Sequence, residues 1–201
     1  MTFKPDRWLS ILLHPLFMMC YAFLTLYLSA SYISFLPDSY KRLLFIALFL
    51  NTIIIPIFIL MLLKRLGTVK SIELFHHRER VFPIVMVIIP YVFTLLLLIR
   101  LQVPEIFIKI VQGGILAMII AATVSYWWKI SLHMVGIGGV TGFIIAGLIL
   151  HYFTSLNLLV VVVVLSGLLV SARLVRGDHC PSQVYTGYLT GLASILLVFL
   201  L

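Results

Sequence analysis

The sequence predicts an all-α fold, a polytopic membrane helical bundle of six to seven spans, and this prediction depends on two observations. Hydrophobic residues make up 63% of the 201 residues and charged residues 10%, whereas a soluble domain has roughly 25% charged residues. The apolar residues are also grouped in runs close to the roughly 20 residues that a helix needs to cross a bilayer. Because no Pro/Ser-rich linker or low-complexity tract divides the chain, we expect a single membrane-embedded domain over residues 1–201.

The first apolar run, Trp8–Ser29, is interrupted by His14 and Pro15. It is therefore either a kinked span or a span that begins with an interfacial turn. The remaining spans are predicted at Leu43–Leu63 with a candidate kink at Pro56, at Pro83–Leu101, from the Gln102–Pro104 turn to about Tyr126, at about Met134–Phe153, at Asn157–Val175 and at Val184–Leu201.

Small residues within the later spans predict where helices pack closely. Gly138 and Gly142 are four residues apart, as are Gly187 and Gly191. Faces of this kind allow two helix backbones to approach each other in a membrane. They are more often packing surfaces than chemical sites.

Three polar connections are predicted to lie on one side of the membrane. Residues 64–82, 127–133 and 176–183 follow the second, fourth and sixth spans, and this parity depends only on spans three to six. Of the loop Lys and Arg residues, the opposite side has only Lys41, Arg42, Arg100 and Lys109. The unusual polar residues converge on the first side, and ionisable groups near membrane depth indicate a functional site: Lys70, Arg78, Arg80, Lys129, Ser131, His133, Arg173 and His179.

Basic groups with two histidines and no carboxylate cluster favour a phosphate site over a metal site. Arginine has planar donors that match phosphate oxygens, and one histidine can attack phosphorus while another moves protons. No His, Asp, Glu or Cys set has the spacing of metal ligands, so no metal or other cofactor is expected. The net charge of +8 is assigned to membrane lipids with phosphate headgroups rather than to nucleic acid, and no obligate protein partner is evident.

The connection between the last two spans resembles a signature of the type 2 phosphatidic acid phosphatase superfamily, which shares its fold with vanadium haloperoxidases. The third signature of this family reads Ser-Arg, five residues, His, three residues, Asp. Arg173, five residues and His179 match it, with Ser171 close to the arginine. Gln183 stands where the aspartate is expected.

The other two signatures are present in looser form. Ser131 and His133 resemble the second signature, Ser-Gly-His, with leucine in place of glycine. The first signature, Lys, six residues and Arg-Pro, has its residue types in the right loop but at other spacings: Lys70, Arg78, Arg80 and Pro83. The resemblance covers about residues 64–191, and the family places its signatures in successive loops on one side of a helical bundle.

The resemblance implies a membrane lipid phosphatase that hydrolyses a lipid phosphate or pyrophosphate without a metal. His179 would attack the phosphorus and form a phosphohistidine, and His133 would protonate the leaving alkoxide and then activate water. Gln183 would orient His179. The phosphoryl oxygens would be held by Arg173, by Arg80 and by either Lys70 or Arg78, with Ser131 as a helix cap or a further donor.

Two other functions remain open from the sequence. A catalytically weak or inactive lipid-phosphate-binding protein of the same fold is favoured by Gln183 and opposed by the presence of both His133 and His179. A small transporter is disfavoured because the chain shows no internal repeat. His14 and His151 are interpreted as packing residues, and Arg176 as a headgroup contact.

The orientation in the membrane is predicted differently by charge and by resemblance. Counting Lys and Arg places the polar loops in the cytoplasm, although many of these charges would be phosphate ligands. The resemblance implies a site on the periplasmic or lumenal face. We therefore expect an integral protein of the cell's inner (plasma) membrane with its site facing the periplasm or exterior.

Overall fold

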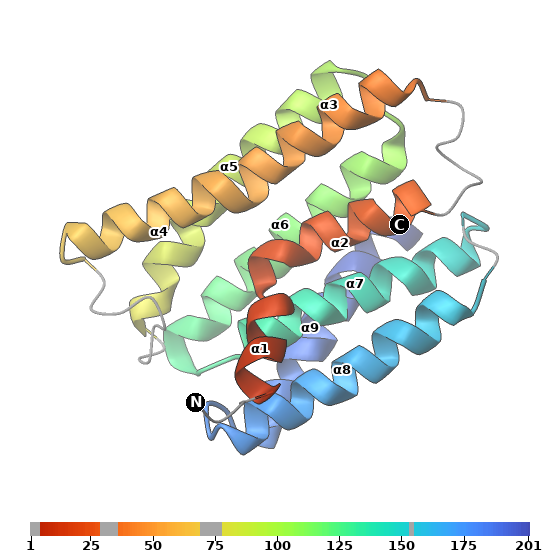
Figure 1. Ribbon diagram of the computed structural model, residues 1–201. Coiled ribbons are helices and arrows are strands. Elements are labelled where there is room, and N and C mark those ends of the chain that lie inside the picture. The colour runs from red at the N-terminus through yellow and green to blue at the C-terminus, as the bar shows by residue number, and fades with distance from the viewer. Residues whose placement is uncertain (1–4, 29–35, 69–77, 153–154) are drawn as a thin grey trace.

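The computed structural model describes residues 5–28, 36–68, 78–152 and 155–201, and the secondary structure in these ranges is helical throughout (Figure 1). Lys70 lies outside the described residues. Six helical stretches in these ranges are long and apolar enough to cross a membrane, or seven if one bent pair is a single span, which confirms the predicted fold class. The helices are α1 (Pro5–Leu12), α2 (Pro15–Leu28), α3 (Asp38–Phe49), α4 (Ile55–Arg65), α5 (Val81–Arg100), α6 (Glu105–Trp127), α7 (Leu132–Ile149), α8 (Asn157–Val175) and α9 (Pro181–Leu200).

The bent pair is α1 and α2, whose axes differ by 60° at the break between them. Pro15 begins α2, a position that needs no backbone N–H, and the N–H of Leu16 donates to Nδ1 of His14 at 3.4 Å. The 14 residues of α2 extend about 21 Å, which is less than the hydrocarbon thickness of about 30 Å. The first apolar run is therefore two short helices with a sharp bend at His14 and Pro15.

The second span is longer than predicted, because α3, a π-helical turn (Leu50–Ile54) and α4 form one continuous stretch. Its first turn contains Asp38 and Lys41, which pair at 2.8 Å, so these charges extend the helix instead of ending it. Pro56 cannot donate to the carbonyl one turn earlier. The π-helical turn lies directly before Pro56, where the regular α-helical hydrogen bond is missing. Within this turn, the Thr52 hydroxyl donates to the Leu48 carbonyl at 2.8 Å.

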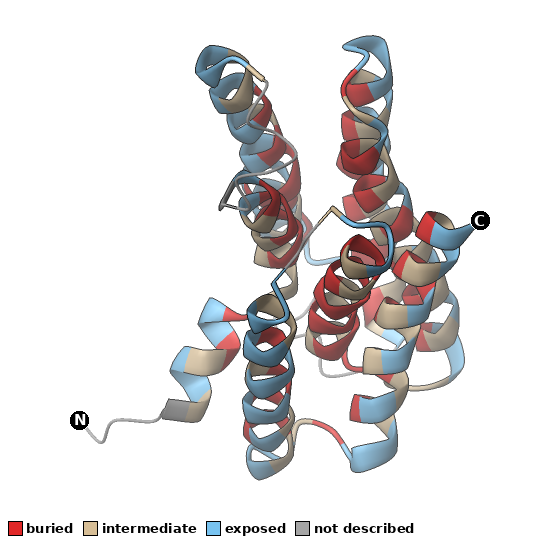
Figure 2. Ribbon diagram, turned by 90° about the vertical axis from the view of Figure 1, so that its right-hand side faces the viewer, coloured by how far each residue is buried: buried red, intermediate tan, exposed pale blue. Residues whose placement is uncertain are grey.

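α7 is the most enclosed of the six spans, with 56% of its residues buried. Figure 2 shows the buried residues on the faces that the helices turn toward one another. The predicted small-residue faces bring α7 and α9 together: a Cβ on Gly138 would meet the Tyr188 backbone, and one on Gly191 would meet the Val135 carbonyl. Such close contact is possible only without side chains at these positions.

The contact between α7 and α9 also joins two of the polar connections. The N–H of Ser131, just before α7, donates to the Gln183 carbonyl in the first turn of α9 at 3.3 Å. α7 begins at Leu132, two residues earlier than predicted, so His133 belongs to its first turn. The beginnings of both helices are therefore fixed relative to each other at one end of the bundle.

Candidate functional site

A cavity of about 630 Å³ lies among α2, α4, α5, α6 and α7. One end of the cavity is polar and the rest is apolar, because the polar residues lie in the connections and in helix turns at one end of the bundle, whereas the apolar residues lie within the spans. The polar end is lined by Arg7, Ser10, His14, Arg80, Lys129, His133, Arg173, Arg176, Asp178 and His179.

The structure brings together four of the residues predicted for the site. Arg80, His133, Arg173 and His179 all line the polar end of the cavity, although they are up to 99 residues apart in the sequence. Arg80 and Arg173 are buried, with exposed fractions of 6% and 9%. The predicted convergence of these residues on one side of the bundle is therefore present in the structure.

Two other predicted ligands do not line the cavity. Arg78 is exposed, and its guanidinium lies 5.5 Å from the ring centre of Tyr126. Ser131 is fully buried at the N-cap position of α7, but its side chain does not cap the helix. Its hydroxyl has no hydrogen-bond partner among the described residues.

Gln183 fixes the tautomer of His179. The Gln183 Oε1 atom lies 3.1 Å from His179 Nδ1 and 3.3 Å from the backbone nitrogen of Cys180. The Cys180 N–H can only donate, so the amide atom facing it is the oxygen. His179 Nδ1 must then carry a proton and donate to this oxygen, and the Nε2 atom is left with its lone pair.

The same side chain completes a capping box at the start of α9. Gln183 is the third residue of the helix and accepts from the backbone of Cys180, while the Cys180 side chain accepts from the Gln183 N–H. This reciprocal arrangement satisfies backbone donors at a helix N-terminus. The position of Gln183 is thus held by the helix start as well as by His179.

His179 is neutral at physiological pH because of its surroundings. Burial, together with the nearby charges of Arg173 and Arg80, lowers the pKa of His179 to about 4, although its hydrogen bond to Gln183 acts in the opposite direction. Burial and the charge of Arg80 also lower the pKa of Lys129. A neutral imidazole with an unprotonated Nε2 is the form that can act as a nucleophile.

His133 is oriented by the N-terminal helix. Its Nε2 atom lies 3.0 Å from the Ser10 carbonyl oxygen of α1, and a carbonyl only accepts, so this nitrogen carries a proton. The His14 ring packs edge-on against the His133 ring, with centroids 5.3 Å apart. The break between α1 and α2 therefore places Ser10 and His14, two residues of the first apolar run, at the site.

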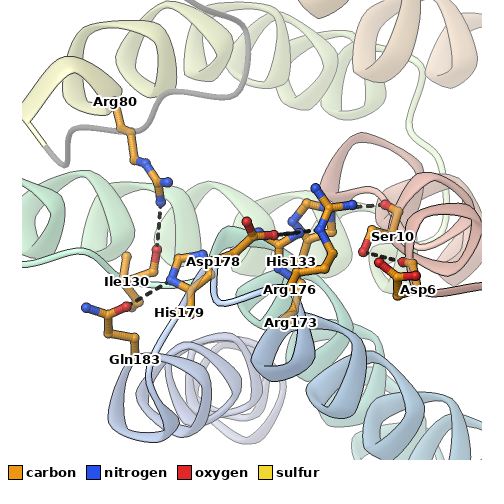
Figure 3. Close-up of polar contacts among 10 residues, drawn as sticks. All are labelled: Asp6, Ser10, Arg80, Ile130, His133, Arg173, Arg176, Asp178, His179 and Gln183. Carbon is orange, nitrogen blue, oxygen red and sulfur yellow. Dashed lines mark hydrogen bonds and ion pairs between the residues drawn. The ribbon is translucent and has the colours of Figure 1, made fainter. Parts of the chain in front are cut away.

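Asp178 supplies a negative charge among these basic groups. Its Oδ2 atom lies 3.1 Å from Arg173 Nη1 and 2.9 Å from Arg176 Nε. Figure 3 shows Asp178 between His179 on one side and the two arginines on the other. Arg80 reaches the site from the 3₁₀ turn Arg78–Arg80 directly before α5, and it donates to the Ile130 carbonyl at 3.2 Å.

Sequence reasoning missed Asp178, Ser10 and His14 as members of the site, and it assigned Arg176 to the headgroups. The position of His14 could have been predicted from one feature of the sequence. The His14-Pro15 pair interrupts the first apolar run near the end of the bundle where the polar loops lie. Asp178 is adjacent to His179, but the direction of its side chain is set by the loop after α8. Ser10 contributes its backbone carbonyl. Every residue type has such a carbonyl, so the sequence gives no signal for this role.

Within the four described ranges, no three His, Cys, Asp or Glu side chains are grouped so that they could hold a metal ion. The ionisable groups at the cavity's polar end are guanidinium, ammonium and imidazole groups, with one carboxylate, that of Asp178. Such a set suits an anion with several oxygen atoms. The chain matches no known family model, no curated protein and no solved structure.

Proposed function

We propose that this protein is a membrane lipid phosphatase that hydrolyses a lipid phosphate or pyrophosphate through a phosphohistidine. The observation that carries the proposal is the state of His179, which is neutral and donates through Nδ1 to Gln183. It lines the polar end of a cavity whose remaining walls are apolar. A phosphate with a hydrocarbon substituent matches both parts of this cavity.

In the first step, the Nε2 atom of His179 attacks the phosphorus and the bond from phosphorus to the lipid oxygen breaks. Arg80 and Arg173 stabilise the charge on the phosphoryl oxygens. His133 accepts a proton at Nδ1, the nitrogen that does not contact Ser10, from the bound phosphate monoanion and passes it to the departing alkoxide. The lipid alcohol leaves, and the phosphoryl group remains on His179.

In the second step, water attacks the phosphohistidine and the bond from phosphorus to nitrogen breaks. His133, now without its Nδ1 proton, accepts a proton from this water. His179 regains its lone pair, and inorganic phosphate is formed. The carbonyl of Ser10 supports both steps, since it accepts from His133 Nε2 in either protonation state.

A second candidate function is lipid-phosphate binding without turnover. It is favoured by Gln183, which orients His179 but carries no negative charge, and by Asp178, which already pairs with Arg173 at 3.1 Å. Both features weaken a phosphatase without removing the phosphate site. The two candidates differ only in whether phosphate is released.

The experiment is phosphate release from a panel of lipid phosphates and pyrophosphates by the purified protein, with His179→Ala as the matched variant. We expect release by the parent protein, in the presence of a metal chelator as well, and none by the variant. Equal release by His179→Ala would overturn the mechanism. Binding by both proteins without release by either would establish the second candidate.

We also propose that the site faces the periplasm or exterior across the inner (plasma) membrane. The resemblance of the three polar connections to the phosphatase signatures supports this orientation. The distribution of Lys and Arg argues for the opposite orientation, but Arg80, Lys129 and Arg173 line the cavity and serve the site. The positions of these three residues therefore do not indicate which side of the membrane is cytoplasmic.

A further inference from the structure

We propose that the apolar part of the cavity takes up one hydrocarbon chain of the lipid phosphate and limits its length. This apolar arm is the part of the cavity lined by α2, α5, α6 and α7 beyond the polar end. The inference rests on the proposed function for the phosphate end. It adds that the chain is enclosed by protein instead of remaining in the bilayer.

Three helices line the cavity in the same order, with a polar residue followed by an apolar stripe. The polar residues are His14 beside α2, Arg80 beside α5 and His133 on α7. Each set is made of residues that are three or four positions from another member, so the set lies on one side of its helix. These sets are Met18, Met19 and Ala22 on α2, Ile84, Val87 and Tyr91 on α5, and Gly136, Gly139, Val140 and Phe143 on α7.

The apolar arm is deep and ends in aromatic rings. His133 and Phe143 are ten residues apart on α7, and at 1.5 Å per residue this corresponds to about 15 Å. Phe143 is fully buried and its ring packs against Phe199 at 5.8 Å. Tyr91 on α5 is also buried. Phe143 and Tyr91, which both line the cavity, form the floor of the arm.

The size and charge of the cavity favour one amphiphilic molecule as the occupant. A volume of about 630 Å³ is within the range of about 300–1,000 Å³ for pockets that enclose a single small molecule. Basic side chains at one end attract a phosphate, and the apolar walls of the rest of the cavity suit a hydrocarbon chain. An uncharged or cationic occupant would gain nothing from the positive charge at this end of the cavity.

The test measures binding of alkyl phosphonates of graded chain length, which keep the phosphate-like head and cannot be hydrolysed at the carbon–phosphorus bond. Val87→Phe fills the arm about 10 Å from the level of Arg80. Val85→Phe is the matched control, because Val85 is on the same helix, is 42% exposed and does not line the cavity. Dividing each variant's affinity by the parent's cancels partitioning of the ligand into detergent.

We expect Val87→Phe to bind the shortest phosphonates as the parent does and the longest at least tenfold more weakly. Phe143→Ala should bind longer chains than the parent accepts, and Val85→Phe should match the parent at every length. If Val87→Phe and the parent bind all lengths alike, the chain lies outside the arm and this inference fails, while the phosphatase proposal stands. If the parent binds no phosphonate of any length, the phosphate site fails and this inference fails with it.

Discussion

At the scale of single residues, the contact between Gln183 and His179 shows that an amide can orient a histidine ring without supplying a negative charge. The amide oxygen accepts from His179 Nδ1 and from the Cys180 N–H, so the tautomer of the histidine is kept. The amide has no negative charge, and the electrostatic support of an imidazolium-like state is absent. In another enzyme, removal of the charge behind a catalytic histidine lowered turnover about ten-thousand-fold, mainly through the wrong tautomer.

Substitutions of Gln183 separate these two effects. Gln183→Glu keeps the length of the side chain and adds charge, so we expect it to match or exceed the parent's rate of phosphate release. Gln183→Leu removes the acceptor from both His179 and Cys180, so we expect most activity to be lost. A melting temperature for each variant distinguishes loss of the helix cap from loss of orientation. A Gln183→Leu protein that releases phosphate as fast as the parent would show that Gln183 does not orient His179.

The protonation of His179 gives a prediction about pH. Its pKa is lowered to about 4 mainly by burial, compared with about 6.5 for an unperturbed histidine. The His179 ring therefore stays neutral as the pH falls through 6.5 and becomes protonated only near pH 4. NMR titration of histidine-labelled protein in detergent, with His179→Ala for assignment, should show a midpoint well below 6.5. A midpoint at or above 6.5 would contradict the buried environment described for this ring.

The residues of the site were predictable from the sequence only where helix geometry determined the contact. Gln183 is one helical turn beyond His179, which is the spacing at which its amide oxygen can reach the ring. Asp178 required knowledge of how the loop turns. Ser10 required the packing of α1 against α8, which brings the Ser10 carbonyl to His133. Side-chain direction and long-range packing are not encoded in local spacing.

At the scale of elements, hydropathy predicted the spans but not their ends. The prediction that the second span begins at Leu43 was wrong by five residues, because Asp38 and Lys41 pair within the first helical turn. Polar residues can therefore extend a helix beyond its apolar run. For the first apolar run the sequence predicted an interruption at His14 and Pro15, but the 60° bend between α1 and α2 could not be predicted from it.

The contact between α7 and α9 is expected to be sensitive to a single methyl group. A Cβ at Gly191 would overlap the Val135 carbonyl, whereas one at Gly167 on α8 meets nothing within 4 Å. Gly191→Ala should therefore destabilise the protein by about 1–3 kcal/mol, as overpacking does in other cores, and displace the start of α9. Gly167→Ala makes the same chemical change in open space and should leave the melting temperature in detergent unchanged or slightly raised. Equal melting temperatures for the two variants would show that α7 and α9 can separate without cost.

At the scale of the whole molecule, the alternation of spans places the site at one end of the bundle, and Cys180 marks that end. Its thiol is exposed beside the buried His179, and hydrogen bonding with Ser182 lowers the pKa of the thiol. A larger thiolate fraction makes this cysteine more reactive. Cys20 is buried within α2 and serves as an internal reference.

Labelling of intact cells with a membrane-impermeant maleimide tests the proposed orientation. We expect Cys180 to be modified from outside the cell and Cys20 to remain unmodified. The signal should disappear in Cys180→Ser, which changes the thiol to a hydroxyl of similar size. Labelling that requires the cytoplasmic face to be opened would reverse the proposed orientation and leave the fold unaffected.

The ion pair between Asp178 and Arg173 bears on how quickly the proposed phosphatase can begin another cycle. Inorganic phosphate is a multiply charged product, and two buried guanidinium groups would hold it tightly. The Asp178 carboxylate lies 3.1 Å from Arg173, so it can take the place of a departing oxygen before Arg173 is left buried and uncompensated. Asp178 would therefore compete with inorganic phosphate for Arg173 and weaken product inhibition. We expect Asp178→Asn to slow the release of inorganic phosphate.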